Sequence, residues 1–394
     1  MIENKIEIIP GFSWFGKNIG IKDNTLDFGG ILADTVCNAA GVFTKNTMAG
    51  PPVIVGKEHL RDGKLQAVIV NSKNANVATS TQGIKDAKII CSLVAESCGI
   101  QTEMVLPSST GVIGKRLPMD VITNGCKSLK QDFGKTEQHI IDFAHSIMTT
   151  DTRTKWVTGK AGNAKILGIA KGSGMIEPNM ATMLCYFMSD AKIESDKLHQ
   201  ILTNAVNKSF NRISVDTDTS TSDTVIIMCN GLAGPVDLNE FESTLTEMSI
   251  FLAKEIASDG EGATKLIELV VSGAQTQEQA LLTAKSVINS PLIKTAIYGS
   301  DPNWGRFVMA IGKVFQYSVN ISDLKIYFGK GADRIRLDAE VLDRNEVPLD
   351  KISAILGNNE VHIEIVIGKG LYSEKVWGCD LTEGYVNINA HYTT

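Results

Sequence analysis

Apolar positions along the chain follow two spacings, and each spacing predicts one kind of element. Residues 65–71 form a short apolar run that ends in a polar turn, which indicates a buried strand. Residues 224–229 show the same pattern after a polar tract, 214–223, that is typical of a Ser/Thr/Asp turn network or of a polar wall beside a site. Longer segments carry apolar residues at helical spacing, and we expect amphipathic helices there: 84–98, 137–150, 195–210 and 241–257.

The C-terminal part of the chain is rich in strand-like runs. We expect strands at 324–328, 334–342, 360–367, 374–377 and 385–389. Helices and strands intermingle without a regular strand–helix–strand repeat. The pattern therefore favours an α+β fold over a doubly wound parallel sheet.

The segment 171–184 near the middle of the chain contains the most informative pattern. Two clusters of turn-forming residues, 172–174 and 177–179, precede the Ala181–Thr182 bond, and an apolar run, 183–188, follows it. A hydroxyl therefore lies where an irregular loop enters a buried element. A chain cut before Thr182 would expose a threonine whose own α-amine acts as general base, so no histidine is needed.

Composition and charge exclude several classes of protein. The chain has 394 residues, of which 43% are hydrophobic and 21% charged, with a net charge of −6. This length predicts two or more packed units. A nucleic-acid-binding protein would carry a dense run of Lys and Arg, which the sequence lacks. The apolar runs of this sequence are shorter than the ~20 residues that a membrane helix needs, and residues 1–7 lack the apolar core of a signal peptide.

Common metal and hydrolase motifs are not found in the sequence. The seven cysteines are scattered without a Cys-x-x-Cys pair, so we expect free thiols in a reducing cytoplasm and no metal site. The six histidines form no His-x-x-His pair. No serine lies in a Gly-x-Ser-x-Gly elbow, although the partners of a catalytic triad need not be neighbours in sequence.

Three further segments allow both a chemical and a structural interpretation. Residues 107–114 form a small-residue turn that can present two donors to an oxyanion, or can simply connect a strand to a helix. Glu261 lies between two glycines, which allow a ligand to approach the backbone or end a helix. Residues 387–394 end the chain in polar groups, for which a frayed terminus is the default.

Taken together, these segments resemble a known family over essentially the whole chain. The chain is similar to the glutamate N-acetyltransferases of arginine biosynthesis, also called ornithine acetyltransferases or the ArgJ family. The matching motifs, in order, are Asn71–Asn76, Ser109–Gly114, Met148–Thr152, Lys171–Leu184, Phe210–Asp216, Asp218–Thr221, Asp259–Lys265, Asp301–Arg306 and Asn389–Thr394. One position departs from the family: Lys73 stands where the family usually has glycine, which concerns the shape of that loop.

The resemblance implies an αββα-type sandwich of the self-cleaving N-terminal-nucleophile kind. It implies a precursor that cuts itself at Ala181–Thr182 into an α chain, 1–181, and a β chain, 182–394, packed together. Thr182 would be the nucleophile, with Thr110 and Gly111 as the oxyanion hole. The implied substrate contacts are Thr149 (or its neighbour Thr150), Lys171, Thr182, Glu261, Asn389 and Thr394.

The activity implied by the resemblance is ping-pong acetyl transfer from N2-acetylornithine to glutamate through acetyl-Thr182. No cofactor or metal is implied. Some family members also acetylate glutamate from acetyl-CoA, and the sequence leaves this open. The implied assembly is cytoplasmic and contains two α and two β chains, with small-molecule substrates, no nucleic acid and no membrane. The role of Glu261 stays open between binding the substrate amine and orienting the nucleophile.

Two other classes of function compete with acetyl transfer. A self-cleaving aminopeptidase or amidase of related layout would share the N-terminal threonine but hydrolyse peptides or amides. A noncatalytic amino-acid-binding relative would never cleave, and its Ala181–Thr182 bond would stay intact in the purified protein.

Overall fold

The computed structural model describes residues 2–177 and 183–392. The chain divides into two compact units. The first comprises Met1–Asn211 and Asp218–Ile256, and the second comprises Arg212–Thr217 and Ala257–Thr394. In sequence, the Ala181–Thr182 bond falls within the range of the first unit.

The first unit is built on a sheet with the strand order β1-β6-β7-β8-β10-β3-β4-β5, in which β2 also pairs with β3. The strands β8 and β10 are parallel, and so are β4 and β5, whereas the other pairs are antiparallel. The bounds are β1 (Ile2–Glu3), β2 (Phe12–Lys17), β3 (Phe28–Phe43), β4 (Lys64–Asn71), β5 (Val105–Ser109), β6 (Lys155–Ala161), β7 (Ala164–Lys171), β8 (Leu184–Lys192) and β10 (Thr224–Pro235).

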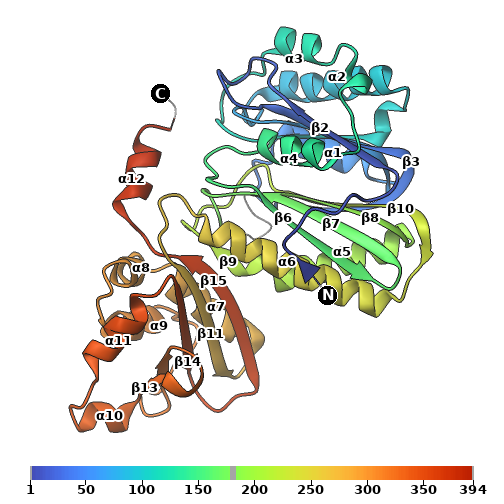
Figure 1. The fold of residues 1–394 in the computed structure, drawn as a ribbon. Coiled ribbons are helices and arrows are strands. Elements are labelled where there is room, and N and C mark those ends of the chain that lie inside the picture. Colours follow the sequence, from blue (N-terminus) through green and yellow to red (C-terminus); the bar gives the residue numbers. More distant parts are fainter. Residues whose placement is uncertain (1, 178–182, 393–394) are drawn as a thin grey trace. The chain divides into compact units, whose positions relative to one another are not determined.

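The long strand β3 joins two layers of this sheet. Its first half pairs with β2 and β4, its second half pairs with β10, and the register with β4 breaks between Leu32 and Cys37. Side chains from both halves meet in one core, which includes Ile31 and Val70 from one layer and Ile169 and Met188 from the other. The sheet therefore folds over itself into a β-sandwich, with α4 packed at the same core (Figure 1).

Helices cover the outer faces of the sandwich. Residues of α1, α2 and α3 share a second core with β2–β5. On the other layer, α5 packs against β3, and Met248 and Leu252 of α6 lie over Gly159 and Gly168. The order helix–sheet–sheet–helix confirms the predicted αββα sandwich. The bounds are α1 (Pro51–His59), α2 (Ser80–Cys98), α3 (Met119–Gly125), α4 (Glu137–Ser146), α5 (Ser195–Lys208) and α6 (Leu238–Ser258).

The second unit has its own sheet, with the order β13-β12-β14-β11-β15-β9. Apolar side chains on one face of this sheet pack against α7, α8, α9 and α11 in a separate core. Its strands are β9 (Ile213–Ser214), β11 (Leu266–Ala274), β12 (Lys325–Phe328), β13 (Ile335–Leu337), β14 (Glu360–Val366) and β15 (Tyr372–Cys379). Its helices are α7 (Gln277–Ile288), α8 (Pro291–Tyr298), α9 (Gly305–Gly312), α10 (Ala339–Asp343), α11 (Leu349–Leu356) and α12 (Glu383–Ala390).

Most of the elements predicted from periodicity are present, but two C-terminal segments differ. The predicted strand 385–389 is wrong: the segment lies in α12, which begins where the Thr382 side chain accepts the N–H of Gly384. The predicted strand 334–342 is confirmed only for β13, because the Asp338 side chain accepts the N–H of Val341 and starts α10. In both segments a local N-cap overrides an apolar pattern that resembles a strand.

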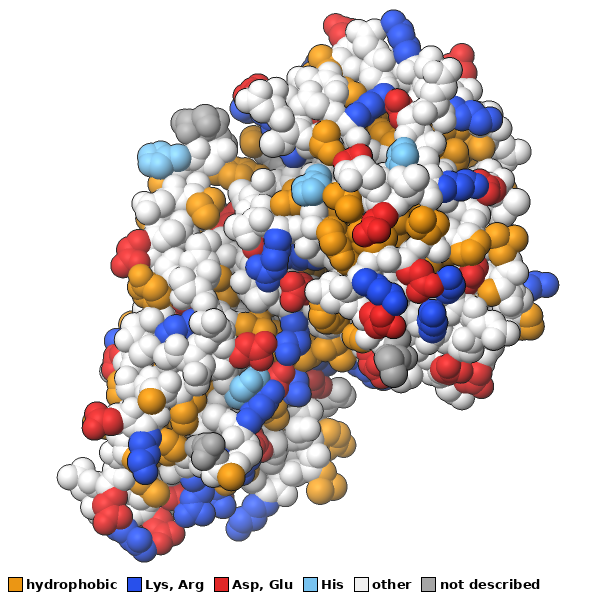
Figure 2. Space-filling view, viewed as in Figure 1, with side chains coloured by type: hydrophobic (Ala, Val, Ile, Leu, Met, Phe, Trp, Pro, Cys, Tyr) orange, Lys and Arg blue, Asp and Glu red, His pale blue; other side chains and the backbone are white. Residues whose placement is uncertain are grey.

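The surface mixes charges of both signs. On the face drawn in Figure 2, Lys and Arg side chains alternate with Asp and Glu side chains over each unit. Among the helices of residues 2–177 and 183–392, none is both long and apolar enough to cross a membrane.

Candidate active site

Several strands of the first unit begin or end at one edge of the sandwich, and Met183 lies at this edge, directly before β8. Ala181 and Thr182 lie outside the described residues, but Thr182 is bonded directly to Met183, the residue before β8. The register aligns the terminal residues of four adjacent strands: Lys171 of β7, Leu184 of β8, Thr224 of β10 and Phe43 of β3.

Thr149 and Lys171, two of the implied substrate contacts, lie side by side at this edge. The Lys171 Nζ is 3.3 Å from the Thr149 Oγ1, so Thr149 rather than Thr150 makes this contact. Asp151 fixes both segments, because its carboxylate accepts the N–H of Thr149 at 3.1 Å and the N–H of Gly172 at 2.6 Å. The turn that follows α4 is therefore tied to the end of β7.

A buried ion pair supports this arrangement. The Lys155 Nζ donates to the Asp151 Oδ1 at 2.8 Å, and both side chains are fully buried. Burial raises the pKa of the Asp151 carboxyl, but the charges of Lys155 and Lys171 and the N–H of Gly172 outweigh burial and lower that pKa to about 2. The carboxylate is therefore ionised across the physiological pH range.

Lys22 attaches the same turn to the other layer of the sandwich. Its Nζ donates to the carbonyl of Met148 at 2.7 Å and to the carbonyl of Leu26 at 3.0 Å, just before β3. Burial lowers the pKa of Lys22 to about 8, and the positive charge of Lys171 adds to this effect while Asp27 opposes it. Two lysines therefore place positive charge around Thr149, which suits a carboxylate ligand.

Replacing Asp151 with asparagine is expected to destabilise the protein strongly. The change leaves the buried Lys155 ammonium without its counter-charge, which typically costs roughly 3–5 kcal/mol. The measurement is urea denaturation beside Asp23→Asn, a matched change at a side chain that is 92% exposed. Equal midpoints for the two variants would contradict this account of the pair.

The same pair predicts how stability depends on pH. The pKa of Asp151 is lower in the folded chain, about 2, than the ordinary value of 3.8. The contribution of Asp151 to the free energy of unfolding is therefore complete above about pH 4, and it is lost as the pH falls toward the pKa of the folded chain.

Thr110 and Gly111, the implied oxyanion hole, form the turn directly after β5. The N–H of Thr110 donates to the carbonyl of Asn71 at 3.1 Å, and the Ser109 Oγ donates to the Asn71 side chain at 2.6 Å. The side chain of Asn71 in turn donates to the carbonyl of Asn74. The loops after β4 and β5 therefore hold each other in a fixed shape.

Lys73, at a position where the resemblance implies glycine, lies in this pair of loops. Its φ is +76°, a left-handed conformation that glycine adopts freely and that costs other residues roughly 1–2 kcal/mol. The loop thus keeps a backbone shape suited to glycine although the residue is lysine. Its carbonyl accepts the N–H of Val112, which holds the two loops together.

Adding a methyl group at Gly111 is expected to displace the turn. Gly111 has φ +125°, and a Cβ there would come within 2.3 Å of the Lys73 carbonyl carbon. Gly114 in the same turn is a matched control, because its φ is also positive but a Cβ there meets nothing within 4 Å. Gly111→Ala should therefore lower activity far more than Gly114→Ala in the same assay. Equal losses of activity in the two variants would show that the close approach of Gly111 to Lys73 is not required for activity.

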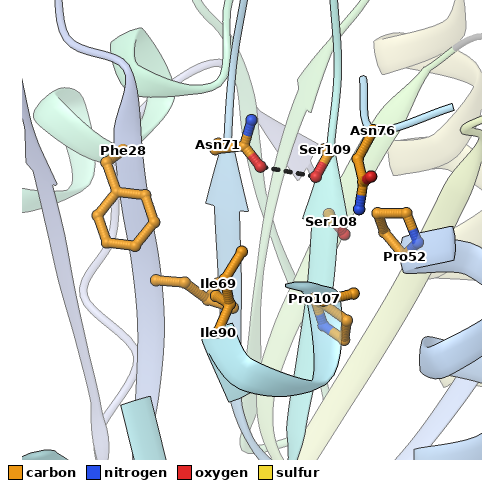
Figure 3. A pocket seen from close by; sticks show the side chains of 10 residues that line it. Phe28, Pro52, Ile69, Asn71, Asn76, Ile90, Pro107, Ser108 and Ser109 are labelled. Atoms are coloured by element: carbon orange, nitrogen blue, oxygen red, sulfur yellow. Dashed lines mark hydrogen bonds between the residues drawn. The ribbon is translucent and has the colours of Figure 1, made fainter. Parts of the chain in front are cut away.

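A small cavity lies behind this turn, as Figure 3 shows. Its volume of about 10 Å³ suits one water molecule and is far too small for an amino-acid substrate. A cavity of this size is not the substrate pocket. The lining residues are Phe28, Pro52, Ile69, Asn71, Asn76, Ala87, Ile90, Pro107, Ser108 and Ser109.

The second unit brings together two other implied contacts, Glu261 and Asn389. The Asn389 amide donates to the Glu261 Oε2 at 2.7 Å, and it also donates to the carbonyl of Tyr385 within α12. Glu261 is buried, whereas Asn389 is exposed. The Thr382 hydroxyl donates to the carbonyl of Gly262 and so fixes the start of α12 beside Glu261. Thr394 lies outside the described residues.

Sequence reasoning did not single out three residues at the edge of the first unit: Asp151, Lys155 and Asp223. Asp151 lies within a recognised motif, and its spacing of four from Lys155 was the available signal. Asp223 ends the polar tract, 214–223, for which the sequence allowed either a turn network or a polar wall beside a site, and its Oδ1 accepts the N–H of Met183 at 3.0 Å. The tract does contain turn contacts, since Ser220 Oγ accepts the N–H of Ser222 and the Thr219 hydroxyl donates to the carbonyl of Glu177.

Potential metal ligands do not cluster in the described part of the chain. Within residues 2–177 and 183–392, no group of three or more His, Cys, Asp and Glu side chains is arranged to hold a metal ion. The seven cysteines are buried free thiols.

Comparison with known proteins relates the whole chain to one family. The model of the ArgJ family matches residues 13–394. "Arginine biosynthesis bifunctional protein ArgJ 2" of Clostridium acetobutylicum is 49% identical over 388 residues, which is 98% of each chain. "Glutamate N-acetyltransferase Oat2" of Streptomyces clavuligerus is 41% identical over 399 residues, again 98% of each chain.

Solved structures give a partial match. Ornithine acetyltransferase from Mycobacterium tuberculosis, complexed with ornithine, is 31% identical, with a TM-score of 0.41 over 43% of this chain and 93% of that chain. The arginine biosynthesis bifunctional protein of Bacillus halodurans is 39% identical, with a TM-score of 0.41 over 43% of this chain and 91% of that chain.

Proposed function

The chain belongs to the ArgJ family, and on that premise we propose that it transfers an acetyl group from N2-acetylornithine to glutamate. The relatives support a role in arginine biosynthesis and an acyltransferase class. The observation that carries the proposal is the match of the family model over nearly the whole chain, because every implied site residue falls on a matching motif. We further propose that the enzyme acts in the cytoplasm.

The proposed nucleophile is Thr182, freed by cleavage of the bond to Ala181. An α-amine has an ordinary pKa of about 8, so a useful fraction is neutral near pH 7 and can accept the Thr182 Oγ proton. The oxygen then attacks the acetyl carbonyl, the acetyl group moves to Thr182 and ornithine leaves. The amine of glutamate takes the acetyl group in the reverse sequence, which gives ping-pong kinetics.

The oxyanion that forms during each attack needs hydrogen-bond donors, and we assign this role to the Thr110 hydroxyl and the Gly111 N–H. Support comes from the turn itself, because the N–H of Thr110 donates to the carbonyl of Asn71 at 3.1 Å and the N–H of Val112 donates to the carbonyl of Lys73 at 3.0 Å. These two hydrogen bonds hold the residues on both sides of Gly111 in a fixed shape.

The substrate contacts are proposed in two groups. In the first unit, Lys171 binds the substrate carboxylate beside Thr149, and the buried Asp151–Lys155 pair holds both residues in place. In the second unit, Glu261 and Asn389 already share a hydrogen bond and, with Thr394, offer polar groups to an amino acid. The acetyl transfer needs no cofactor, since the nucleophile and its base are both supplied by Thr182.

We propose that cleavage leaves an α chain, 1–181, and a β chain, 182–394, in an assembly with two copies of each. The packing of the first unit supports tight association of the two chains after cleavage. The strand β7 from the α chain pairs with β8 from the β chain along Ile166–Lys171, and β10 from the β chain pairs with β3 from the α chain. Breaking the single bond at Ala181–Thr182 leaves these ladders intact.

A second candidate activity is acetylation of glutamate from acetyl-CoA. The observation that favours it is the word "bifunctional" in the names of several relatives. Incubation with acetyl-CoA and glutamate, with release of the free CoA thiol as the readout, tests it. Release no faster than with the Thr182→Ala variant would exclude this activity.

The proposed transfer is tested with N2-acetylornithine that carries a radiolabel in its acetyl group. Purified protein and glutamate should yield labelled N-acetylglutamate, and initial rates at several glutamate concentrations should give the parallel double-reciprocal lines of a ping-pong reaction. Release of amino acids from peptides without acetyl exchange would favour an aminopeptidase. Binding of ornithine without any turnover would favour an amino-acid-binding protein.

A further inference from the structure

Asp380 is a buried acid that binds the turn carrying Glu261. It directly follows β15 and is 3% exposed. Its Oδ1 accepts the N–H of Thr264 at 2.8 Å and the N–H of Lys265 at 3.0 Å, and its Oδ2 accepts the Thr264 hydroxyl. The N–H of Asp380 donates to the carbonyl of Lys265 at 3.3 Å. One residue therefore makes four hydrogen bonds to the end of the Glu261 turn.

The chain just after Asp380 binds the same turn and then starts α12. The Thr382 hydroxyl donates to the carbonyl of Gly262 at 2.6 Å and accepts the N–H of Gly384 at 3.0 Å. Gly262 has φ +71°, and a Cβ there would come within 2.4 Å of the Tyr385 nitrogen. The backbone at the start of α12 therefore lies directly against the turn, as only glycine at this position allows.

The position of Asn389 depends on these contacts at the start of α12. None of the residues described in α12 is buried, and the helix extends away from the core of the second unit (Figure 1). The Tyr385 hydroxyl adds a contact to Asp216 at 3.4 Å. The Asn389 amide then donates to the Glu261 Oε2 at 2.7 Å. The spacing of Asn389 and Glu261 therefore follows from how the turn and the helix start are joined.

Lys265 fixes the same turn on the core of the second unit. Its Nζ donates to the carbonyls of Ile297 and Leu356 at 2.7 and 2.8 Å, and to the Ser300 Oγ at 2.9 Å. These acceptors lie at or just after the ends of α8 and α11. Burial lowers the pKa of the Lys265 ammonium, and the negative charge of Asp380 opposes this effect. The turn is therefore held on one side by the helices and on the other by Asp380.

We propose that Asp380 is a positioning residue for binding of the amino-acid substrate. It holds the turn against α12, so that Glu261 and Asn389 keep the spacing at which both bind the substrate. Their side-chain oxygens are acceptors, which suits a substrate amine. This role rests on the proposed function, because Glu261 and Asn389 are substrate contacts only there. Asp380 acts through them, since its own carboxylate is bonded to the turn.

The test compares Asp380→Ala with Asp380→Asn and with a control variant. Alanine removes all the side-chain hydrogen bonds to the turn. Asparagine keeps them, because its oxygen can accept both N–H groups and its amide can donate to the Thr264 hydroxyl. Asp338→Ala is the matched control, since Asp338 also lies in the second unit and also accepts a backbone N–H, that of Val341 at 3.2 Å. It follows the edge strand β13, which β12, β14 and β11 separate from β15.

The measurements are KM and kcat for N2-acetylornithine, and the Kd of ornithine by calorimetry. For Asp380→Ala we expect KM and Kd to rise by roughly 10–100-fold, as is typical when the support behind a binding residue is lost. Its kcat should change little, because the proposed nucleophile and oxyanion hole, Thr182, Thr110 and Gly111, are unaltered. Asp380→Asn should restore KM to near the wild-type value, and Asp338→Ala should keep it.

A double-mutant cycle separates positioning of Glu261 from general damage to the fold. Glu261→Ala removes the side chain through which Asp380 is proposed to act, and with it the hydrogen bond to Asn389. In that background, Asp380→Ala should raise KM by a much smaller factor than in the wild type. Equal factors in the two backgrounds would show that Asp380 does not act through Glu261 and would overturn the proposal.

Thr264→Val decides the matter if Asp380→Ala does not fold. Valine has nearly the shape of threonine, and Thr264 is exposed, so the fold should tolerate the change. The variant removes only the hydroxyl that donates to Asp380, and KM should rise in the same direction by a smaller factor. A wild-type KM in this variant would then count against the positioning role.

The outcomes also distinguish this role from the proposed function. If the wild type transfers acetyl groups and Asp380→Ala keeps the wild-type KM, or raises it no more than Asp338→Ala does, the positioning role is wrong and the proposed function stands. If the wild type binds ornithine without any acetyl transfer, the proposed function is wrong, and the Kd values of the same variants decide the role of Asp380. Absence of both binding and transfer would overturn both.

Discussion

Thr182→Ala is expected to leave the chain whole and to abolish acetyl transfer. The variant lacks the oxygen that attacks Ala181, so no new N-terminus forms and no acetyl group can be held covalently. Loss of the nucleophile in a serine protease lowers turnover by about 10⁶-fold. The measurement is an intact-mass spectrum with N-terminal sequencing, followed by the labelled acetyl-exchange assay.

Thr182→Ser is the matched control, because serine keeps the hydroxyl and loses only a methyl group. It should still cleave and should retain measurable exchange. Thr182→Ala chains that are cut at the same bond, or that exchange acetyl groups at the wild-type rate, would place the nucleophile elsewhere in the chain.

Thr110→Ala has the second largest expected effect. The variant removes one of two proposed donors to the oxyanion while the N–H of Gly111 remains. Loss of one such donor typically lowers kcat by about 10²–10³-fold, or roughly 3–4 kcal/mol of barrier. Because the oxyanion forms only after attack, kcat should fall far more than KM rises. Steady-state kinetics with N2-acetylornithine on already cleaved protein would show this split.

Thr110→Ser keeps the hydroxyl and removes only the methyl group. The variant therefore tests the hydroxyl apart from the rest of the side chain, and it should keep most of the activity. The position is buried and its N–H bonds to Asn71, so a check of thermal stability belongs with the kinetics. An equal loss in the alanine and serine variants would point to packing at this position instead of oxyanion binding.

The fold could largely be predicted from periodicity, and the failures have a local cause. Helices such as α2 and α5 have amphipathic faces that are visible in the sequence and are buried as expected. The segment in α12 alternates like a strand, but the Thr382 side chain caps a helix there. Within residues 2–177 and 183–392, neither sheet includes this segment. The pairing of β3 with strands of both layers could not be predicted from the sequence, because the partners of a strand are segments far away along the chain.

The candidate site could be predicted only as a set of motifs. The resemblance pointed to Thr149 and Lys171 separately, and the structure adds that they touch. The buried pair of Asp151 and Lys155 was invisible, because a sequence does not reveal which of its many charged residues lose contact with water. Asp223 was hidden for the same reason: in a tract of Ser, Thr and Asp, an acid that caps a turn and an acid that is buried look alike.

The most direct test of the account is an intact-mass spectrum of the wild-type protein after incubation with N2-acetylornithine alone. Without glutamate, the acetyl group should remain on the enzyme. The account predicts two chains, of which the one that begins at Thr182 is heavier by one acetyl group, and this increment should disappear when glutamate is added. A single uncut chain, or an acetyl group on any other residue, would contradict it.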